Sequence, residues 1–183
     1  MHYYALVEVP DGKAILEDRL AEVLEPYRES DFAEERQDHE LWDGWTIGGR
    51  YTGRLDGYDP TTDPLNQERC WICAGTGKRD DELGRRSRVE NPGYTCNGCD
   101  GTGTRTKWPT IWHKHHGDVS KFKDVPESAK PYTLIACGRA VSREVYDGSL
   151  PSGERFVDNS AELDRLWSEI GPEATVVVVD LHI

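Results

Sequence analysis

The hydrophobic pattern is most regular towards the two ends of the chain. An apolar, aromatic-rich run at 3–9 ends at a Pro-Asp-Gly turn signal and predicts a strand. Apolar residues at spacings of three and four predict helices over 13–28 and 160–170. Glu25-Pro26 is expected to end or kink the first helix, and Ser160 is expected to cap the second.

The remaining segments are shorter and less regular. A valine run within 175–183 predicts a central strand that is buried on both faces. Residues 132–137 and 140–146 read as a hairpin across Gly138, and 45–55 read as a strand bent at Gly48-Gly49. The other expectations are a short helix or connector at 29–40, a linker at 57–64, an irregular segment at 108–131 and a loop at 147–159.

This order of elements is close to β-α-β-β-α-β, the ferredoxin-like split unit. We therefore expect an α+β fold with a ferredoxin-like antiparallel sheet and two helices. Residues 1–64 and 126–183 together form the predicted domain. Residues 65–125 form a predicted insertion, made of a zinc-knuckle or zinc-ribbon module and an irregular connector.

A duplicated motif carries the strongest chemical signal. Residues 70–77 and 96–103 both read C-x-x-C-x-G-T-G. Two pairs of thiols supply the four ligands of a tetrahedral zinc ion, and the glycines permit the positive φ that the tight turns require. Four protein ligands leave no position for a substrate, so the prediction is one structural zinc ion, bound by Cys70, Cys73, Cys96 and Cys99.

The motif resembles the cysteine-rich zinc domain of DnaJ-type chaperones, which is built from C-x-x-C-x-G-x-G repeats. That family has four repeats and two zinc ions, whereas this chain has two repeats, enough for one ion. The chain has no His-Pro-Asp tripeptide, so the Hsp70-stimulating activity of the family is not carried over. The resemblance covers residues 70–103 alone.

A second resemblance extends beyond the cysteines. The chain is similar to small uncharacterised proteins of bacteriophages that infect actinobacteria. It is carried by the W-x-x-W-x-I-G-G-R stretch at 42–50, the knuckle pair, and the Lys-Trp-Pro segment at 107–109. This resemblance implies a phage origin and no particular biochemistry.

Composition and charge narrow the possible partners. The 183 residues are 36% hydrophobic and 31% charged, so the apolar core is small and zinc is expected to compensate. The net charge of −12 is uneven: −10 over 1–69, +3 over 70–125 and −5 over 126–183. Four thiolates with one Zn²⁺ lower the middle value to about +1. The acidic body favours a protein partner and disfavours non-specific nucleic acid.

The location is expected to be a reducing cytoplasm. The chain has no apolar run near 18 residues, and its first residues lack the pattern of a signal peptide. In a reducing compartment the four paired cysteines are metal ligands rather than disulfides. Cys137 is interpreted as a free thiol in a strand or turn.

A glycine- and arginine-rich stretch is a candidate ligand site. Backbone N–H groups beside Gly-Gly and two arginines suit an anion, and nearby aromatic rings suit a stacked base. The alternative is a bent strand whose aromatics anchor the zinc module to the sheet and whose arginines pair with the abundant acids. The candidate residues are Trp42, Trp45, Gly48, Gly49, Arg50 and Arg54.

Two further clusters have weaker signals. His113, His115 and His116 form either a second metal site or an exposed loop, with Asp118 as the obvious carboxylate partner. The basic run at 85–88 contacts phosphate or an acidic partner, or lies in a solvated loop.

The leading functional hypothesis is a non-enzymatic zinc-containing binding protein, phage-encoded, that engages a host protein in takeover or anti-defence. It rests on the absence of any nucleophile–base arrangement and on the acidic body. The first alternative is a nucleotide or nucleic-acid binder or hydrolase that uses the stretch 42–54. The second is chaperone-like binding of unfolded chains through the zinc module.

Overall fold

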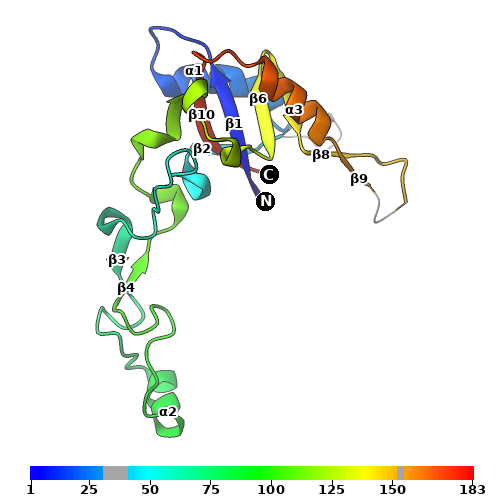
Figure 1. Ribbon diagram of the computed structural model, residues 1–183. Coiled ribbons are helices and arrows are strands. Elements are labelled where there is room, and N and C mark those ends of the chain that lie inside the picture. Colours follow the sequence, from blue (N-terminus) through cyan, green and yellow to red (C-terminus); the bar gives the residue numbers. More distant parts are fainter. Residues whose placement is uncertain (31–40, 152–154) are drawn as a thin grey trace. The chain divides into compact units, whose positions relative to one another are not determined.

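A computed structural model describes residues 1–30, 41–151 and 155–183 (Figure 1). The chain divides into two compact units. The sheet unit comprises Met1–Tyr58 and Lys114–Ile183, and the cysteine unit comprises Asp59–His113. The segment 114–125, which the sequence interpretation places in the insertion, thus belongs to the sheet unit. Most of the short element expected at 29–40 lies outside the described residues.

The sheet unit is built on one six-stranded sheet. Its path is β2-β10-β1-β6-β7, and β5 also pairs with β10. The strands are β1 (His2–Val9), β2 (Gly44–Ile47), β5 (Val119–Lys121), β6 (Thr133–Ala136), β7 (Arg139–Ser142) and β10 (Thr175–His182).

β1 and β10 form the centre of this sheet. They are antiparallel over eight pairs, from His2 opposite His182 to Val9 opposite Thr175. Every residue of β10 from Val176 to Leu181 is buried. A valine-rich strand has this pattern when both of its faces are covered, which confirms the predicted central, two-sided position.

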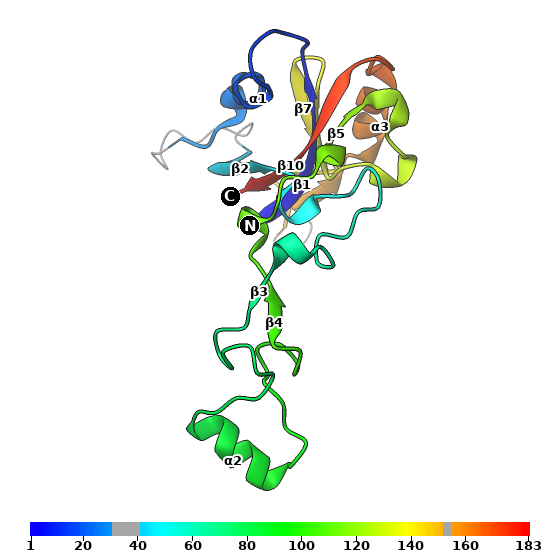
Figure 2. The same ribbon diagram turned by 90° about the vertical axis from the view of Figure 1, so that its left-hand side faces the viewer.

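Two helices cover the opposite faces of the sheet (Figure 2). α1 (Leu16–Leu24) packs Leu20 and Leu24 with the odd-numbered residues of β1 and β10. α3 (Ser160–Glu169) packs Leu163 and Leu166 with the even-numbered residues. The alternation follows from the period of two along a strand, which sends successive side chains to opposite faces.

The mixed α+β class is confirmed, but the ferredoxin-like arrangement is not. The prediction of a wholly antiparallel sheet is wrong, because β1 and β6 pair in parallel. β5 is an additional strand within the segment 108–131, which was expected to be irregular. Its three residues carry too short a pattern to indicate a strand without the neighbouring β10.

Several element boundaries also differ from the sequence prediction. The strand expected over 45–55 ends at Ile47, where Gly48 takes a φ of 68° and the chain turns into a short 3₁₀ helix. The helix α3 has Asn159 rather than Ser160 at its N-cap, and the Ser160 amide bonds to Asp158 Oδ1 instead. Part of the loop expected at 147–159 is a strand, since β8 (Glu144–Tyr146) pairs with β9 (Phe156–Asp158).

Other local expectations are confirmed. α1 ends at Leu24, directly before the Glu25-Pro26 pair, and a 3₁₀ turn follows. The hairpin across Gly138 is present as β6–β7 and turns at Cys137 and Gly138, which have φ values of 52° and 75°. Its second strand ends at Ser142 and not at 146, because residues 144–146 pair with β9. Two successive residues with positive φ are typical of a tight hairpin turn whose twist matches the strands. Cys137 is exposed in this turn.

The cysteine unit has three regular elements. β3 (Gln67–Arg69) and β4 (Thr104–Thr106) form a two-stranded antiparallel ribbon. α2 (Glu82–Glu90) lies between the two cysteine motifs. The basic run at 85–88 thus lies in a helix and not in a solvated loop: Asp81 caps the helix through the Gly84 amide, and charged helix-forming residues fill it. These residues form no apolar face, so the sequence lacked the periodicity that identifies a packed helix.

No helix in the described parts of the chain is long and apolar enough to cross a membrane.

Candidate metal centre

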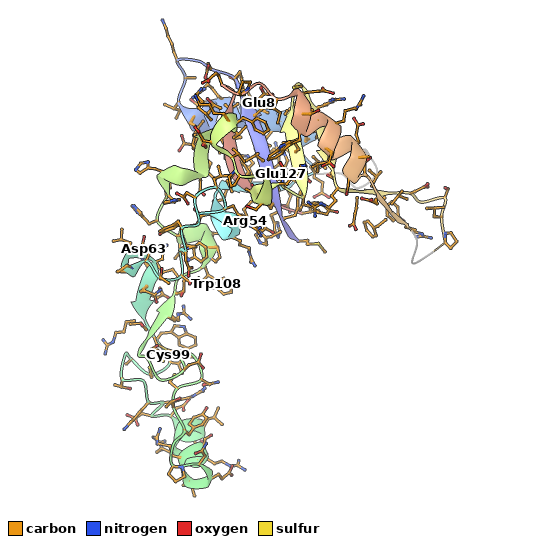
Figure 3. All side chains as sticks on the ribbon, viewed as in Figure 1. Glu8, Arg54, Asp63, Cys99, Trp108 and Glu127 are labelled. Carbon is orange, nitrogen blue, oxygen red and sulfur yellow. The ribbon has the colours of Figure 1, made fainter. Side chains whose placement is uncertain are left out.

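The four motif cysteines converge at one point of the cysteine unit. The sulfur atoms of Cys70, Cys73, Cys96 and Cys99 all lie within 4.8 Å of one another, and all four residues are buried. Each motif contributes two sulfurs, and sulfurs of different motifs lie beside one another. Cys70 Sγ lies 3.9 Å from Cys96 Sγ, and Cys73 Sγ lies 3.7 Å from Cys99 Sγ. Figure 3 labels Cys99 at this site.

These distances fit one zinc ion. Four sulfurs at about 2.3 Å from a tetrahedral zinc are separated by about 3.8 Å from one another. A disulfide has a sulfur–sulfur distance of about 2.05 Å, so the cysteines are not paired covalently. Four sulfur donors leave no open coordination position, which is the arrangement of a structural rather than a catalytic zinc site.

The two motifs have nearly the same local structure. The amide of Gly75 donates to Cys70 O at 3.1 Å, and the amide of Gly101 donates to Cys96 O at 3.3 Å. Thr76 Oγ donates to the carbonyl of its preceding cysteine at 2.7 Å, and Thr102 Oγ makes the same bond at 2.6 Å. The threonines therefore close each turn, a role that the sequence interpretation did not assign to them.

Reciprocal hydrogen bonds join the two motifs. The Cys70 amide donates to Gly103 O, and the Cys96 amide donates to Gly77 O, both at 2.9 Å. The two turns thus contact each other symmetrically, each through the same pair of backbone groups. This symmetry explains why both motifs carry the same glycine-threonine-glycine sequence.

The glycines at the ends of the motifs are required by this packing. Gly77 and Gly103 have φ values of 71° and 84°, where side chains are strained. A Cβ at Gly77 would overlap with Gly101 O, and one at Gly103 would overlap with Gly75 O. The sequence prediction of positive φ at the motif glycines is confirmed.

The thiols differ in their tendency to ionise. Burial opposes ionisation of Cys73, but hydrogen bonds from the Gly77 amide and the neighbouring thiols outweigh it and lower its pKa to about 6. Burial dominates at Cys96 and raises its pKa to about 11. Thiolates are the metal-binding form, so the hydrogen bonds that lower the pKa of Cys73 favour the state that binds a cation.

The predicted histidine cluster is divided by the fold. His113 lies in the cysteine unit, where its amide donates to Asn66 Oδ1. His115 and His116 lie in the sheet unit. The His115 ring stacks on Tyr58 and its Nε2 lies 2.6 Å from Asp56 Oδ2, so its carboxylate partner is Asp56. Among the described residues, the four cysteines are the one group of three or more potential ligands close enough to share a metal ion.

The glycine–arginine candidate site is also divided, in this case by the sheet. Trp42 is buried, donates from its indole to Leu24 O and packs with Trp45 on the α1 face. Arg54 lies over the rings of Tyr4 and Tyr51, which pack on the α3 face. The tryptophans therefore do not stack a ligand that Arg54 binds.

Two buried carboxylates hold the turn that carries the glycines. Asp180 Oδ2 accepts from the Arg50 amide at 3.0 Å, and a Cβ at Gly49 would lie 2.5 Å from the Asp180 Cβ. Asp118 accepts from Thr52 Oγ and from the Gly53 amide, and burial raises its pKa. The amides of Arg50 and Gly53 in this turn thus bind the protein's own carboxylates.

The arginine side chains of this turn have no acidic partner in the described parts of the chain. The guanidinium of Arg50 is exposed and forms no ion pair there, and that of Arg54 (Figure 3) contacts aromatic rings instead of a carboxylate. The expected pairing of both arginines with acidic residues is therefore not seen within residues 1–30, 41–151 and 155–183.

Comparison with protein families, with curated proteins and with solved structures gives no match for this chain. No family is therefore shown for this chain, and what the structure supports is a cluster of four cysteines that could bind one zinc ion.

Proposed function

We propose that this protein is a non-enzymatic, zinc-containing binding protein whose cysteine unit presents the surface for a protein partner. One zinc ion, bound by Cys70, Cys73, Cys96 and Cys99, replaces an apolar core in that unit. The proposal extends to a phage-encoded protein that engages a host protein in a bacterial cytoplasm, with a takeover or anti-defence role. The sequence resemblance of 42–50 and 107–109 to phage proteins supports that extension.

The observation that carries the proposal is the placement of apolar side chains in the cysteine unit. All of its residues are described, and apart from the cysteines none of its large hydrophobic side chains is buried. Six are more than half or about half exposed: Leu65, Trp71, Leu83, Val89, Trp108 and Ile111. We take these exposed apolar side chains, on a unit without an apolar core, as the contact points for a partner.

Trp71 is the best anchor for a partner on this surface. It lies between Cys70 and Cys73, and 69% of its surface is exposed. The Arg105 guanidinium lies 5.6 Å from the Trp71 ring centroid and is paired with Glu68 at 2.6 Å. A tryptophan that is fixed on a rigid turn loses little conformational entropy on binding, and tryptophan and arginine dominate protein interfaces energetically.

Charge favours a protein over nucleic acid as the partner. The cysteine unit contains eight Lys and Arg and eight Asp and Glu residues. Zinc with four thiolates adds a charge of −2, so the loaded unit is slightly acidic. An acidic surface lacks the electrostatic term that supplies most of non-specific nucleic-acid binding.

A photo-reactive amino acid at position 71 tests the proposal. The zinc-loaded protein is irradiated in a bacterial lysate, and the adducts are identified by mass spectrometry. One dominant folded protein is expected at position 71 and not at position 146, an aromatic site in the sheet unit that is 57% exposed. Adducts with many unfolded chains would favour the chaperone-like alternative, and adducts with RNA or DNA would overturn the protein partner.

Nucleotide binding or hydrolysis at the glycine–arginine turn is the second candidate function. The observation that favours it is the guanidinium of Arg50, which forms no ion pair within the described residues although the chain is strongly acidic. Thermal melts with a nucleotide panel test this candidate. A rise in Tm of the wild type that is lost in Arg50→Ala supports it, and equal melts of both proteins with every nucleotide exclude it.

A further inference from the structure

Two histidines and two aspartates meet at one end of the six-stranded sheet. His2 in β1 lies directly opposite His182 in β10, and their ring centroids are 4.6 Å apart. Asp180 lies two residues before His182, on the same face of β10, and Asp43 directly precedes β2. Figures 1 and 2 both show the two chain ends side by side at this place.

Each imidazole is oriented by its own carboxylate. His2 Nδ1 lies 2.9 Å from Asp180 Oδ1, and His182 Nδ1 lies 2.7 Å from Asp43 Oδ1. Asp180 is almost fully buried, and its other oxygen accepts from the Arg50 amide, so its position is fixed. An ionised carboxylate only accepts hydrogen bonds, which places the ring proton on Nδ1 of both histidines.

Both Nε2 atoms are consequently lone-pair donors without a protein partner. Neither forms a hydrogen bond or ion pair with any residue in the described ranges 1–30, 41–151 and 155–183. The side chains of His2 and His182 keep 25% and 47% of their surface exposed, so water and small ions reach them.

The backbone holds the two rings close together. The Ile183 amide donates to Met1 O at 2.9 Å, so residues 1 and 183 form the hydrogen-bonded pair. Hydrogen-bonded and non-hydrogen-bonded pairs alternate along antiparallel strands, and His2 with His182 is therefore of the second kind, in which side chains lie closer. Their proximity requires no ordering when a ligand binds.

We propose that His2 and His182 form a second metal site, which binds one divalent transition-metal ion through their two Nε2 atoms. Imidazole nitrogen suits Zn²⁺, Ni²⁺ and Cu²⁺, whereas Mg²⁺ and Ca²⁺ prefer oxygen ligands. Metal-binding histidines characteristically donate their other N–H to a carboxylate, which fixes the tautomer and makes the ligand more basic. Asp43 and Asp180 supply this second layer of contacts.

Such a site differs in kind from the cysteine centre. Two protein nitrogens leave the remaining coordination positions to water, so the ion exchanges with the solvent. The cysteine centre encloses its ion with four buried sulfurs. The histidine site is thus expected to bind its ion more weakly than the cysteine centre. Its ion can therefore be exchanged while the zinc stays in the cysteine centre.

A titration of the zinc-loaded, isotope-labelled protein with Ni²⁺, followed by NMR of the imidazole signals, tests the proposal. One saturable equivalent of Ni²⁺ is expected to broaden the signals of His2 and His182 first, while the zinc content stays constant. His182→Ala should abolish this saturable phase. His116→Ala is the control. It removes an exposed histidine that is not part of the His2–His182 pair, and it should leave the saturable Ni²⁺ phase unchanged.

Asp43→Asn keeps both imidazoles and is the second test variant, to be used if His182→Ala fails to fold. Loss of the carboxylate is expected to weaken Ni²⁺ binding by about 10–100-fold. If the broadening is spread equally over His113, His115 and His116, or if Asp43→Asn binds Ni²⁺ as tightly as the wild type, the proposal is wrong. The aspartate–histidine pairs then serve only to hold the strands together.

Discussion

The sheet unit and the cysteine unit solve the problem of stability in different ways. The sheet unit buries two apolar clusters, one on each face of its sheet. The buried cluster of the cysteine unit consists of four cysteines, with Ile72 packed against it. One chain therefore combines a domain with an apolar core and a unit whose buried cluster consists of four potential metal ligands. The comparison shows that the few hydrophobic residues of the chain are not shared evenly between the two units, because the apolar clusters lie in the sheet unit.

This division has a consequence for how the two units respond to change. Apolar burial depends on side-chain volume and is insensitive to chelators, whereas metal binding depends on thiolates and on access to zinc. Each perturbation below is expected to affect one unit and spare the other.

Removal of a metal ligand is expected to have the largest effect. Cys73→Ser leaves three sulfurs, and the metal-binding free energy that folds such modules is on the order of 10 kcal/mol or more. Elemental analysis should show loss of zinc, and hydrogen exchange should show loss of protection over 59–113 with β1 and β10 still protected. Cys137→Ser removes the exposed thiol and should change neither. Joint melting of both units would show that they share one cooperative core.

Truncation in the apolar core is expected to have the converse effect. Leu166→Ala removes a fully buried side chain of α3, which typically costs about 2–5 kcal/mol. Urea unfolding of the sheet unit should move to lower concentration while the zinc content remains at one per chain. Leu83→Ala, at an exposed position of α2, should stay within about 0.5 kcal/mol of the wild type. Loss of zinc from Leu166→Ala would contradict the independence of the two units.

A methyl group at Gly77 is expected to have an intermediate effect on the cysteine unit. Alanine there is strained at a φ of 71° and overlaps with Gly101 O, and such strain costs about 1–3 kcal/mol. The result should be faster loss of zinc to a chelator, measured with a colorimetric zinc indicator. Gly93→Ala in the same unit meets only the Asn91 side chain at 3.4 Å and should lose zinc at the wild-type rate. If Gly77→Ala and the wild type lose zinc at equal rates, a methyl group at Gly77 does not overlap with Gly101 O.

The smallest effect is expected from the pH dependence of the sheet unit. Burial raises the pKa of Asp118 above its value of about 3.9 in the unfolded chain. The folded state then binds the proton more tightly, so this group's contribution to stability is fully present below about pH 3.9 and is lost as the pH rises through the folded pKa.

Asp118→Asn should remove this contribution. Its amide oxygen still accepts from the Gly53 amide, so the variant is expected to fold. Urea unfolding followed by NMR signals of β1 and β10, at several pH values, gives the difference between variant and wild type. That difference should favour the variant increasingly as the pH rises from 4. A difference that does not change with pH would show that Asp118 titrates normally.

Sequence patterns predicted the features that depend on neighbouring residues. The duplicated cysteine motif determined the ligand set, and matched spacing explains why the same four residues converge. The apolar periodicity of 13–28 and 160–170 and the valines of 175–183 determined two helices and the central strand. These signals are local, and each is repeated several times within one element.

The tertiary structure decided the features that depend on distant residues. The sequence does not show that β1 pairs in parallel with β6, or that three residues at 119–121 add a strand beside β10. Charged α2 carries no apolar stripe, so nothing in its sequence distinguishes a helix from a loop. Register between distant strands arises from backbone pairing across the whole chain, and a local pattern contains no information about it.

The cysteine centre and the proposed histidine site show this contrast between local sequence pattern and tertiary structure most clearly. The sequence by itself determined the cysteine centre, because a C-x-x-C turn brings two ligands together within four residues and the chain repeats it. Only the tertiary structure placed His2 beside His182, which are 180 residues apart in sequence, with Asp43 and Asp180 behind them. The physical reason is that a β-sheet joins residues by register rather than by sequence distance, so single histidines become neighbours only when the strands pair.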